Sequence, residues 1–410
     1  MTTQAADVRP RPPSPTDGGS SSITVDAATV DHVRAALVAE GVEPTAANVA
    51  GALRQQGWLL GPAAILDLVH GLRSELAGAG PLEGLLREPG VSDVLVNGSG
   101  DVWVDRGLGL ARTDLHFASA SAVRSLAIRL AAAVGRRLDD ATPYVDVRMP
   151  DGTRLHAILP PVSPDGVCLS LRVPARRDFS VTDLVQSGSL PERGALWLQA
   201  LIEGRLAFVV SGGTGSGKTT LLSCLLSLVG PTERIVLVED SGELRPDHPH
   251  VVRLEARPPN VDGAGEVTLR DLVRQALRMR PDRLVVGEVR GGEVVDLLAA
   301  LNTGHEGGCG TVHANSTADV PPRLEALAVA AGLGREALHS QLAAGLDAVV
   351  HLTRGRDQLR RVAEIAVLER GADGLVCAVP AVIFTGGRVV AGPGASALRR
   401  RMTAAAGPVA

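Results

Sequence analysis

A glycine-rich segment carries the clearest chemical signal in the sequence. Residues 212–219 read Gly-Gly-Thr-Gly-Ser-Gly-Lys-Thr and match the whole G-x-x-x-x-G-K-S/T phosphate-binding loop. Its glycines let successive backbone N–H groups turn toward a phosphate, while Lys218 suits the β- and γ-phosphates and the Thr219 hydroxyl suits Mg²⁺. The nucleotide-binding residues that this pattern predicts are Gly213, Thr214, Gly215, Ser216, Gly217, Lys218, Thr219 and Thr220.

Acidic side chains follow two apolar stretches that are typical of buried strands. Glu239 and Glu243 come after residues 235–238, and Glu288 comes after residues 284–286. Ligands bind beyond the carboxyl ends of parallel strands, so we expect these acids to face the nucleotide. Hydrolysis of a phosphoanhydride needs one carboxylate near Mg²⁺, usually through water, and one that orients or deprotonates the attacking water. The other interpretation is that the acids cap helices or meet solvent.

The stretch 303–315 leaves three interpretations open. His305, Cys309 and His313 are spaced by four residues, as zinc ligands on a helix would be, but the glycines among them disfavour a helix. A structural histidine with satisfied hydrogen bonds is the second interpretation. The third places His313 at the end of a short strand, 310–313, where its ring would bond a γ-phosphate or the carboxylate that positions water.

Arginines are further candidates, because a cation commonly neutralises the charge that develops on a transferred phosphoryl group. Arg290 follows the second acidic strand, and Arg154 and Arg172 lie in the part of the chain before the phosphate loop. The last two reach the phosphates only if their domain packs over the nucleotide, which spacing does not establish.

The elements around the phosphate loop have the order that its mechanism requires. An apolar strand, 206–210, precedes the loop, and an apolar helical run, 221–228, follows it. Strand and helix patterns alternate as far as about residue 352, which predicts a parallel α/β domain. The part before it mixes short strands with a helix over 120–134 and is typical of a smaller α+β domain. The predicted divisions are a disordered tail 1–24, a helical region 25–77, an α+β domain 78–174, a linker 175–180, an α/β domain 181–385 and a basic flexible tail 386–410.

Composition excludes several classes of protein. The chain has 410 residues and a net charge of −4, so no overall positive field attracts nucleic acid. With 3 Trp, 1 Tyr and 4 Phe it lacks the base-stacking platforms of a DNA-translocating motor. Four scattered cysteines indicate a reducing compartment. No apolar run approaches the ~20 residues of a membrane-spanning helix, and the N-terminus does not resemble a secretory signal peptide. We therefore expect a cytoplasmic protein without a transmembrane segment.

Four motifs together resemble a known family. The loop 212–219, VEDSGEL at 238–244, LRMRPDRLVVGEVRGGE at 277–293 and NTGHEGGCGTVHAN at 302–315 are similar to the Walker A, Asp box, Walker B and His box of the type II/IV secretion ATPase superfamily. The branch that they most resemble contains the ATPases of tight-adherence (Flp) pilus assembly and conjugal transfer. The resemblance extends over about residues 78–352. Cys309 departs from it, because a smaller or hydroxylic residue is expected there.

The resemblance implies a RecA-like ATPase domain, a smaller N-terminal domain and a homo-oligomer, expected to be a hexamer, that holds ATP and Mg²⁺ between its domains. It implies that Glu239 activates water, that Glu288 is the Walker B carboxylate near Mg²⁺ and that His313 is the His-box contact. Arg154, Arg172 or Arg290 would contact the phosphates. The implied partners are inner-membrane platform proteins, which places the chain in the cytoplasm or at the inner face of the cytoplasmic membrane.

Two other functions remain open. A nucleotide-gated scaffold would bind ATP without turnover, and a DNA-transfer-associated ATPase would act on DNA through other subunits, since no direct contact with nucleic acid is expected. A P-loop GTPase is disfavoured because the guanine-reading N/T-K-x-D sequence is missing.

Overall fold

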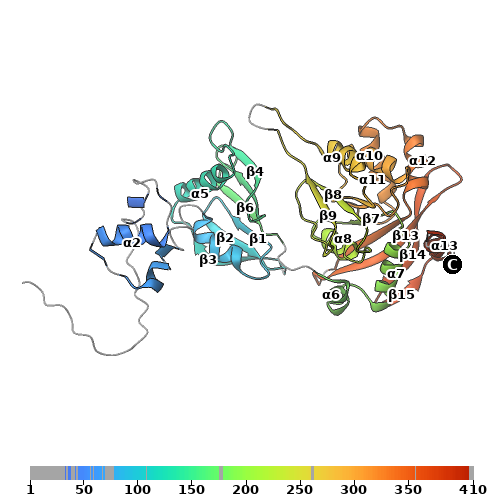
Figure 1. The fold of residues 1–410 in the computed structure, drawn as a ribbon, viewed down its shortest axis with the longest axis horizontal. Helices are drawn as coiled ribbons and strands as arrows, with labels where there is room; N and C mark the ends of the chain where they lie inside the picture. The colour runs from blue at the N-terminus through green and yellow to red at the C-terminus, as the bar shows by residue number, and fades with distance from the viewer. Residues whose placement is uncertain are drawn as a thin grey trace, which may run out of the picture. The chain divides into compact units, whose positions relative to one another are not determined.

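The computed structural model describes residues 78–107, 109–174, 179–259, 263–355 and 357–405, together with parts of the stretch 33–69. The predicted tail 1–24 and most of the predicted linker 175–180 lie outside the described residues. The chain divides into two compact units between Val173 and Pro174 (Figure 1), and each unit is described by itself. Among the described residues, no helix is both long enough and apolar enough to cross a membrane.

The first unit contains an antiparallel six-stranded sheet in the order β3-β2-β1-β6-β5-β4. Its valines and leucines alternate with polar residues, so one face of the sheet is buried under helices α4 and α5. Within the predicted helical region, α2 spans Ala46–Gln55 and buries Val49 and Leu53. The remaining elements of this unit are η1 (Gly80–Leu82), α4 (Glu83–Arg87), β1 (Asp93–Val96), β2 (Asp101–Asp105), β3 (Leu110–His116), α5 (Ala120–Ala133), β4 (Tyr144–Arg148), β5 (Arg154–Ile158) and β6 (Cys168–Arg172).

The second unit contains a nine-stranded sheet in the order β15-β14-β13-β12-β7-β11-β10-β8-β9. The six strands from β12 to β9 pair in parallel, and β13, β14 and β15 extend the sheet as antiparallel strands. The phosphate loop follows β7, one of the central strands, and helices connect the parallel strands except β8 and β9, which a loop joins. This topology confirms the predicted α/β class, with a RecA-like domain after a smaller α+β domain.

The bounds of the second unit's elements follow the sequence patterns closely around the predicted site. They are α6 (Val181–Gln186), α7 (Glu192–Glu203), β7 (Phe208–Gly212), α8 (Lys218–Leu226), β8 (Ile235–Glu239), β9 (Val251–Glu255), α9 (Leu269–Ala276), η2 (Leu277–Met279), β10 (Arg283–Val286), α10 (Glu293–Leu301), β11 (Cys309–Val312), α11 (Val320–Ala330), α12 (Arg335–Gly345), β12 (Ala348–Arg354), β13 (Arg360–Arg370), β14 (Val376–Thr385), β15 (Arg388–Ala391) and α13 (Ala395–Ala405).

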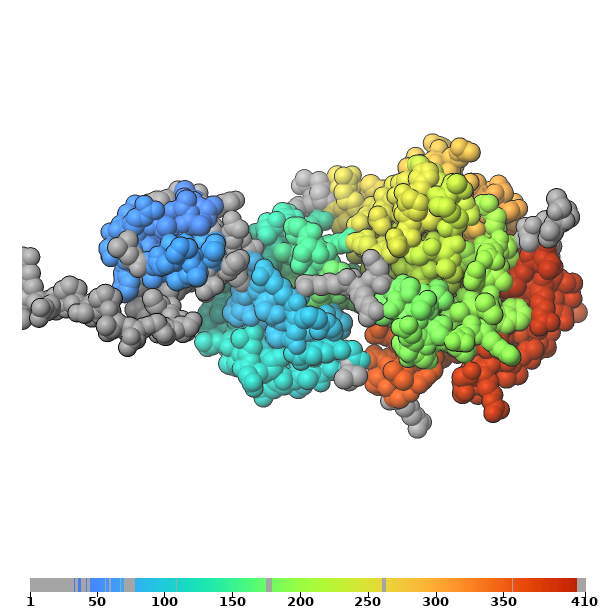
Figure 2. All heavy atoms as spheres, turned by 60° about the horizontal axis from the view of Figure 1, so that its bottom comes forward, coloured from blue at the N-terminus to red at the C-terminus, as the bar shows by residue number. Residues whose placement is uncertain are grey.

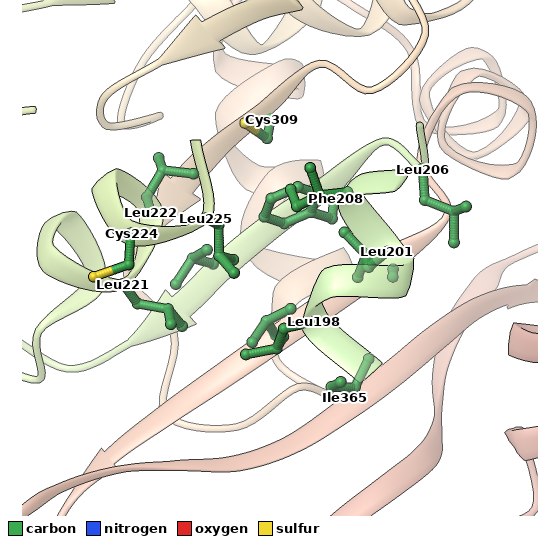
Figure 3. Close-up of a cluster of buried hydrophobic side chains, with 14 of the residues drawn as sticks. Leu198, Leu201, Leu206, Phe208, Leu221, Leu222, Cys224, Leu225, Cys309 and Ile365 are labelled. Carbon is green, nitrogen blue, oxygen red and sulfur yellow. The ribbon is translucent and has the colours of Figure 1, made fainter. Parts of the chain in front are cut away.

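Apolar cores lie on both faces of this sheet, as near-continuous apolar strands require. Helices α7, α8 and α13 cover one face, and helices α9 to α12 cover the other. Figure 3 shows the first core, in which Leu198 and Leu201 of α7 and Leu221 and Leu225 of α8 belong to one cluster with Phe208 of β7. Phe208 is 0% exposed, and its packing in this core fixes the strand that leads into the phosphate loop.

The predicted flexible tail 386–410 is wrong for its described residues. It forms β15 and the helix α13, and Leu398 of α13 is fully buried in the core. The guanidinium of Arg401 donates to the backbone carbonyls of Asp347 and Leu368, each at 2.6 Å, and Arg399 lies over the ring of Trp197. In the space-filling view, the red C-terminal residues are packed into the body of the second unit (Figure 2). Residues 406–410 lie outside the described part.

Candidate functional site

Backbone geometry confirms the strand, loop and helix that were predicted around the phosphate loop. Strand β7 ends at Gly212 and helix α8 begins at Lys218, with Gly217 as its N-cap at φ +94°. A Cβ on Gly212 would lie 2.6 Å from both the Leu352 carbonyl oxygen and Ser216 Oγ, so only glycine fits there. The N-terminus of α8, with its positive dipole end, therefore opens directly from this loop.

Lys218 lies against the loop that precedes it. Its ammonium is mostly buried and donates to the carbonyls of Gly212 at 3.1 Å and Gly213 at 2.9 Å. The same nitrogen lies 3.5 Å from His313 Nδ1. The ammonium group is thus held where the loop encloses it, beside the His-box histidine.

Glu239 is buried at the end of β8. Its Oε1 accepts the backbone N–H groups of Glu243 and Leu244, both at 2.9 Å, while its Oε2 has no hydrogen-bond partner among the described residues. Burial is the main cause that raises the pKa of Glu239 to about 7. Gly287 packs directly on it, since a Cβ there would lie 2.7 Å from Glu239 Cγ. Glu239 therefore holds the turn that carries Glu243.

The chain after that turn runs along α8 in regular register. Thr219 Oγ1 donates to Glu243 Oε2 at 3.4 Å, Ser223 Oγ accepts the N–H of Arg245 at 3.1 Å, and Ser227 Oγ accepts the N–H of Asp247 at 2.8 Å. Four helical residues advance about 6 Å, close to the ~6.7 Å of two extended residues, so every second residue meets a hydroxyl. These three contacts, here called the hydroxyl ladder, place the Glu243 carboxylate beside Thr219.

A chain of polar contacts joins the Walker B and His-box residues. His313 Nε2 lies 3.1 Å from Glu288 Oε1, and Arg290 Nη2 lies 3.3 Å from Glu288 Oε2 and 2.8 Å from Asp240 Oδ2. The backbone N–H groups of Arg290 and Gly291 both donate to the buried Glu293 carboxylate at 2.7 Å. Glu293 thereby fixes the turn from which Arg290 reaches two carboxylates.

The protonation of His313 follows from its neighbours. Burial and then the Lys218 ammonium lower the pKa of His313. An ammonium can only donate, so Nδ1 is the ring nitrogen that accepts, and the Nε2–H then donates to Glu288. A neutral ring with this tautomer links the phosphate loop to the Walker B carboxylate.

His305, Cys309 and His313 are not arranged as ligands of one zinc ion. Cys309 begins strand β11 with its side chain in the apolar core, and burial raises the pKa of this thiol to about 12, which disfavours the thiolate that binds zinc. His305 Nδ1 instead lies 3.2 Å from the Ala300 carbonyl oxygen. Across the described residues, no group of three or more His, Cys, Asp or Glu side chains is placed to hold a metal ion.

Mg²⁺ bound together with phosphates is a different case, and the donor set fits it. Thr219, Glu243 and Glu288 offer oxygen atoms, which Mg²⁺ prefers, and Mg²⁺ usually takes only one or two protein ligands besides phosphates and water. The buried Ser216 Oγ, which has no hydrogen-bond partner in the described part of the chain, adds a polar atom to the same loop.

Arg154 and Arg172 lie in the first unit. They are direct neighbours on β5 and β6, and Arg154 forms two hydrogen bonds of 2.8 and 2.6 Å with the Asp146 carboxylate. Both side chains are exposed, at the same end of these two interior strands. Their predicted contact with the nucleotide stays a prediction.

The second unit thus brings together Lys218 and Thr219 of α8, Glu288 and Arg290 after β10, and His313 after β11. Sequence reasoning noticed Glu243 but did not choose it as a site residue. The signal that could have selected it is the four-residue spacing of Thr219, Ser223 and Ser227 along the helix.

Comparisons with known proteins agree with these motifs. A model of the family described as type II/IV secretion system protein matches residues 75–379. A putative conjugal transfer protein of Mycobacterium tuberculosis is 57% identical over 329 residues, which cover 78% of this chain and 93% of that protein. A probable conjugal transfer protein TrbB of Sinorhizobium fredii is 32% identical over 70% of this chain and 86% of its own length.

Solved structures show more distant likeness. The VirB11 ATPase of the Brucella suis type IV secretion system is 27% identical, with a TM-score of 0.37 over 70% of this chain and 91% of its own. The pilus retraction motor PilT with bound ADP is 19% identical, with a TM-score of 0.48 over 77% and 83%. The family match and the identity to the conjugal transfer proteins decide the assignment: this chain belongs to the type II/IV secretion system protein family.

Proposed function

We propose that this chain is a Mg²⁺-dependent ATPase that acts as the motor of a secretion or pilus-assembly machine. The observation that carries the proposal is the convergence of Lys218, Thr219, Glu243, Glu288 and His313 at the carboxyl ends of neighbouring parallel strands. A P-loop alone would bind phosphate. The carboxylates near the loop supply what hydrolysis requires in addition, which is a group that holds Mg²⁺ and a group that orients water.

The residues divide the work as follows. The loop N–H groups and the Lys218 ammonium bind the phosphates, and the ammonium leaves the carbonyls of Gly212 and Gly213 to do so. Thr219 and Glu288, the latter through water, hold Mg²⁺, which when bound neutralises charge on the phosphate oxygens. Arg290 and the His313 Nε2–H keep the Glu288 carboxylate oriented.

Glu243 is the better candidate to orient the attacking water. It lies beside Thr219, whereas Glu239 is 3% exposed and uses one oxygen to hold the loop. That Glu239 activates water stays a prediction, and the raised pKa of Glu239 supports it because such a pKa suits a general base. Geometry favours Glu243 in that role and Glu239 as the residue that positions it.

Assembly and partners are part of the same proposal. We propose a homo-oligomer, a hexamer, in which Arg154 or Arg172 of the smaller domain meets the nucleotide, in the cytoplasm or at the inner face of the membrane beside platform proteins. The second candidate, an ATPase of DNA transfer, is favoured by the names of the M. tuberculosis and S. fredii relatives. The composition argues that such a role acts through other subunits.

The test is ATP hydrolysis by the purified full chain with Mg²⁺. Lys218→Ala should abolish turnover, and Glu243→Gln should lower kcat by about 10²–10⁴-fold, as loss of a group that handles the reacting proton does. Glu239→Gln should cost less than Glu243→Gln. Glu306→Gln, an exposed carboxylate before β11, is the control and should leave the rate unchanged.

Each outcome separates the candidates. Wild-type turnover no faster than that of Lys218→Ala, with a fluorescent ATP analogue still bound, would favour the nucleotide-gated scaffold. If Glu239→Gln lowers kcat more than Glu243→Gln does, Glu239 is the residue that activates water.

A further inference from the structure

A buried histidine and a half-buried glutamate stand on two neighbouring strands whose other residues near the core are mostly apolar. His351 of β12 is 5% exposed and interrupts the run Ala348–Val349–Val350 and Leu352, while Glu364 is its cross-strand partner on β13. Burying a polar group is costly unless it is hydrogen-bonded. Their partners therefore indicate what these two side chains are for.

Both side chains bind the segment that leaves the His box. Residues 313–319, here called the crossover segment, connect β11 to α11. Burial lowers the pKa of His351, and a hydrogen bond with the backbone of Asn315 acts in the opposite direction, so the partner on Asn315 is its carbonyl oxygen. The buried hydroxyl of Thr317 donates to Glu364 Oε1.

His351 also contacts the strand that carries the phosphate loop. Its Nδ1 lies 2.8 Å from Ser211 Oγ, and Ser211 is the residue before Gly212, whose carbonyl accepts from Lys218. Ser211 is fully buried and pairs with Val312 on its other side, the residue before His313. A single ring thus connects the approach to the phosphate loop with the backbone two residues after His313.

We infer that His351 and Glu364 are positioning residues that clamp the crossover segment, so that His313 reaches Lys218 and Glu288 together. Directional hydrogen bonds at Asn315 and Thr317 fix where the segment lies, which apolar contacts alone would allow to slide. The inference rests on the proposed ATPase function, because the consequence of the clamp is the geometry of that site.

A second buried histidine supplies a matched control. His339 of α12 is 3% exposed, accepts the Val376 N–H at 2.9 Å and lies 3.0 Å from Glu325. It has two hydrogen bonds, as His351 does, but they join α12 to β14 and α11 rather than to the phosphate loop. Loss of either ring removes a buried hydrogen-bonded group, but only loss of the His351 ring should change catalysis.

The experiment compares Thr317→Val, Thr317→Ser, His351→Phe and His339→Phe in the full chain. Misplacement of a site by about 1 Å can cost about 10²-fold, so we expect Thr317→Val and His351→Phe to lower kcat about tenfold or more. KM for ATP should change much less, because the phosphate loop itself is intact. Thr317→Ser keeps the hydroxyl and should restore kcat, and His339→Phe should leave kcat per folded chain near the wild-type value.

Amide hydrogen exchange gives a readout that does not need turnover. Exchange in residues 313–319 should be faster in Thr317→Val than in the wild type, with the β7 amides unchanged. Unchanged kcat and unchanged exchange in Thr317→Val would overturn the clamp, as would an equal loss of kcat in His339→Phe. An inactive wild type would refute the proposed ATPase instead, while the exchange comparison would still decide whether the clamp exists.

Discussion

Gly307 offers a sharp test of how the His-box loop is anchored. Arg283 at the start of β10 is 1% exposed, and its guanidinium lies 2.8 Å from Glu233 Oε2 and 3.0 Å from the Ile202 carbonyl oxygen. A Cβ on Gly307 would lie 2.1 Å from Arg283 Nη1 and 3.1 Å from its Cδ. Although a guanidinium is a flexible side-chain end, this one is enclosed and cannot move without breaking the buried ion pair.

The magnitude follows from a comparison with Gly304 in the same loop. Both glycines have positive φ, +69° at Gly307 and +90° at Gly304, but nothing lies within 4 Å of a Cβ on Gly304. Gly304→Ala should therefore cost only the left-handed backbone penalty, about 1–2 kcal/mol. Gly307→Ala should add the loss of a buried ion pair, about 3–5 kcal/mol.

Thermal unfolding of the second unit, followed by circular dichroism, measures this difference. At about 2–4 °C for each kcal/mol in a domain of this size, Gly307→Ala should unfold about 6–20 °C below Gly304→Ala. If the two variants unfold within about 2 °C of each other, Arg283 is not held as described and the reasoning is refuted.

Three other outcomes are expected. Arg401→Ala should destabilise the second unit by about 2 kcal/mol or more, because two carbonyls lose a charged donor, while the exposed Arg400→Ala should stay within about 0.5 kcal/mol in urea unfolding. Folding raises the pKa of Glu239 from 4.5 to about 7. Between these two pH values the folded state binds more protons than the unfolded state, so the contribution of Glu239 to stability falls as the pH rises. The stability of Glu239→Gln relative to the wild type should therefore rise by about 2 kcal/mol between pH 5 and pH 8, and a flat difference would contradict the raised pKa. Elemental analysis of the purified chain should find no stoichiometric zinc, whereas one zinc per chain would revive the His-box metal site.

Local sequence was sufficient for the phosphate loop and for the elements beside it. Strand β7, helix α8 and strands β8 and β10 lie within a few residues of their predicted places, because each is an apolar run bounded by glycine, proline or acidic residues. The helix predicted over 120–134 is α5, whose cap is the Ser119 side chain. These features depend on neighbours in the chain.

Contacts between distant segments explain what was missed. Whether Glu239 or Glu243 meets Thr219 depends on the course of the chain along α8, and the spacing of Thr219, Ser223 and Ser227 is informative only once that course is known. The C-terminal segment has a composition typical of a tail, yet Arg401 bonds carbonyls of residues 54 and 33 positions earlier in the chain. Burial of Leu398 likewise depends on a core that it shares with Leu198 and Phe208, far earlier in the chain.

The hydroxyl ladder also restricts how the length of this loop can change. Groups alternate sides along an extended segment, so one residue added or removed between Glu239 and Glu243 would displace the Glu243 carboxylate. The same change between Glu243 and Asp247 would turn the N–H of Arg245 or Asp247 away from α8. The rise of four helical residues and the rise of two extended residues differ by less than about 1 Å. This mismatch is small enough for three contacts to form but would prevent a long series of them. Insertions made after Asp247, between the ladder and β9, should therefore leave the site intact.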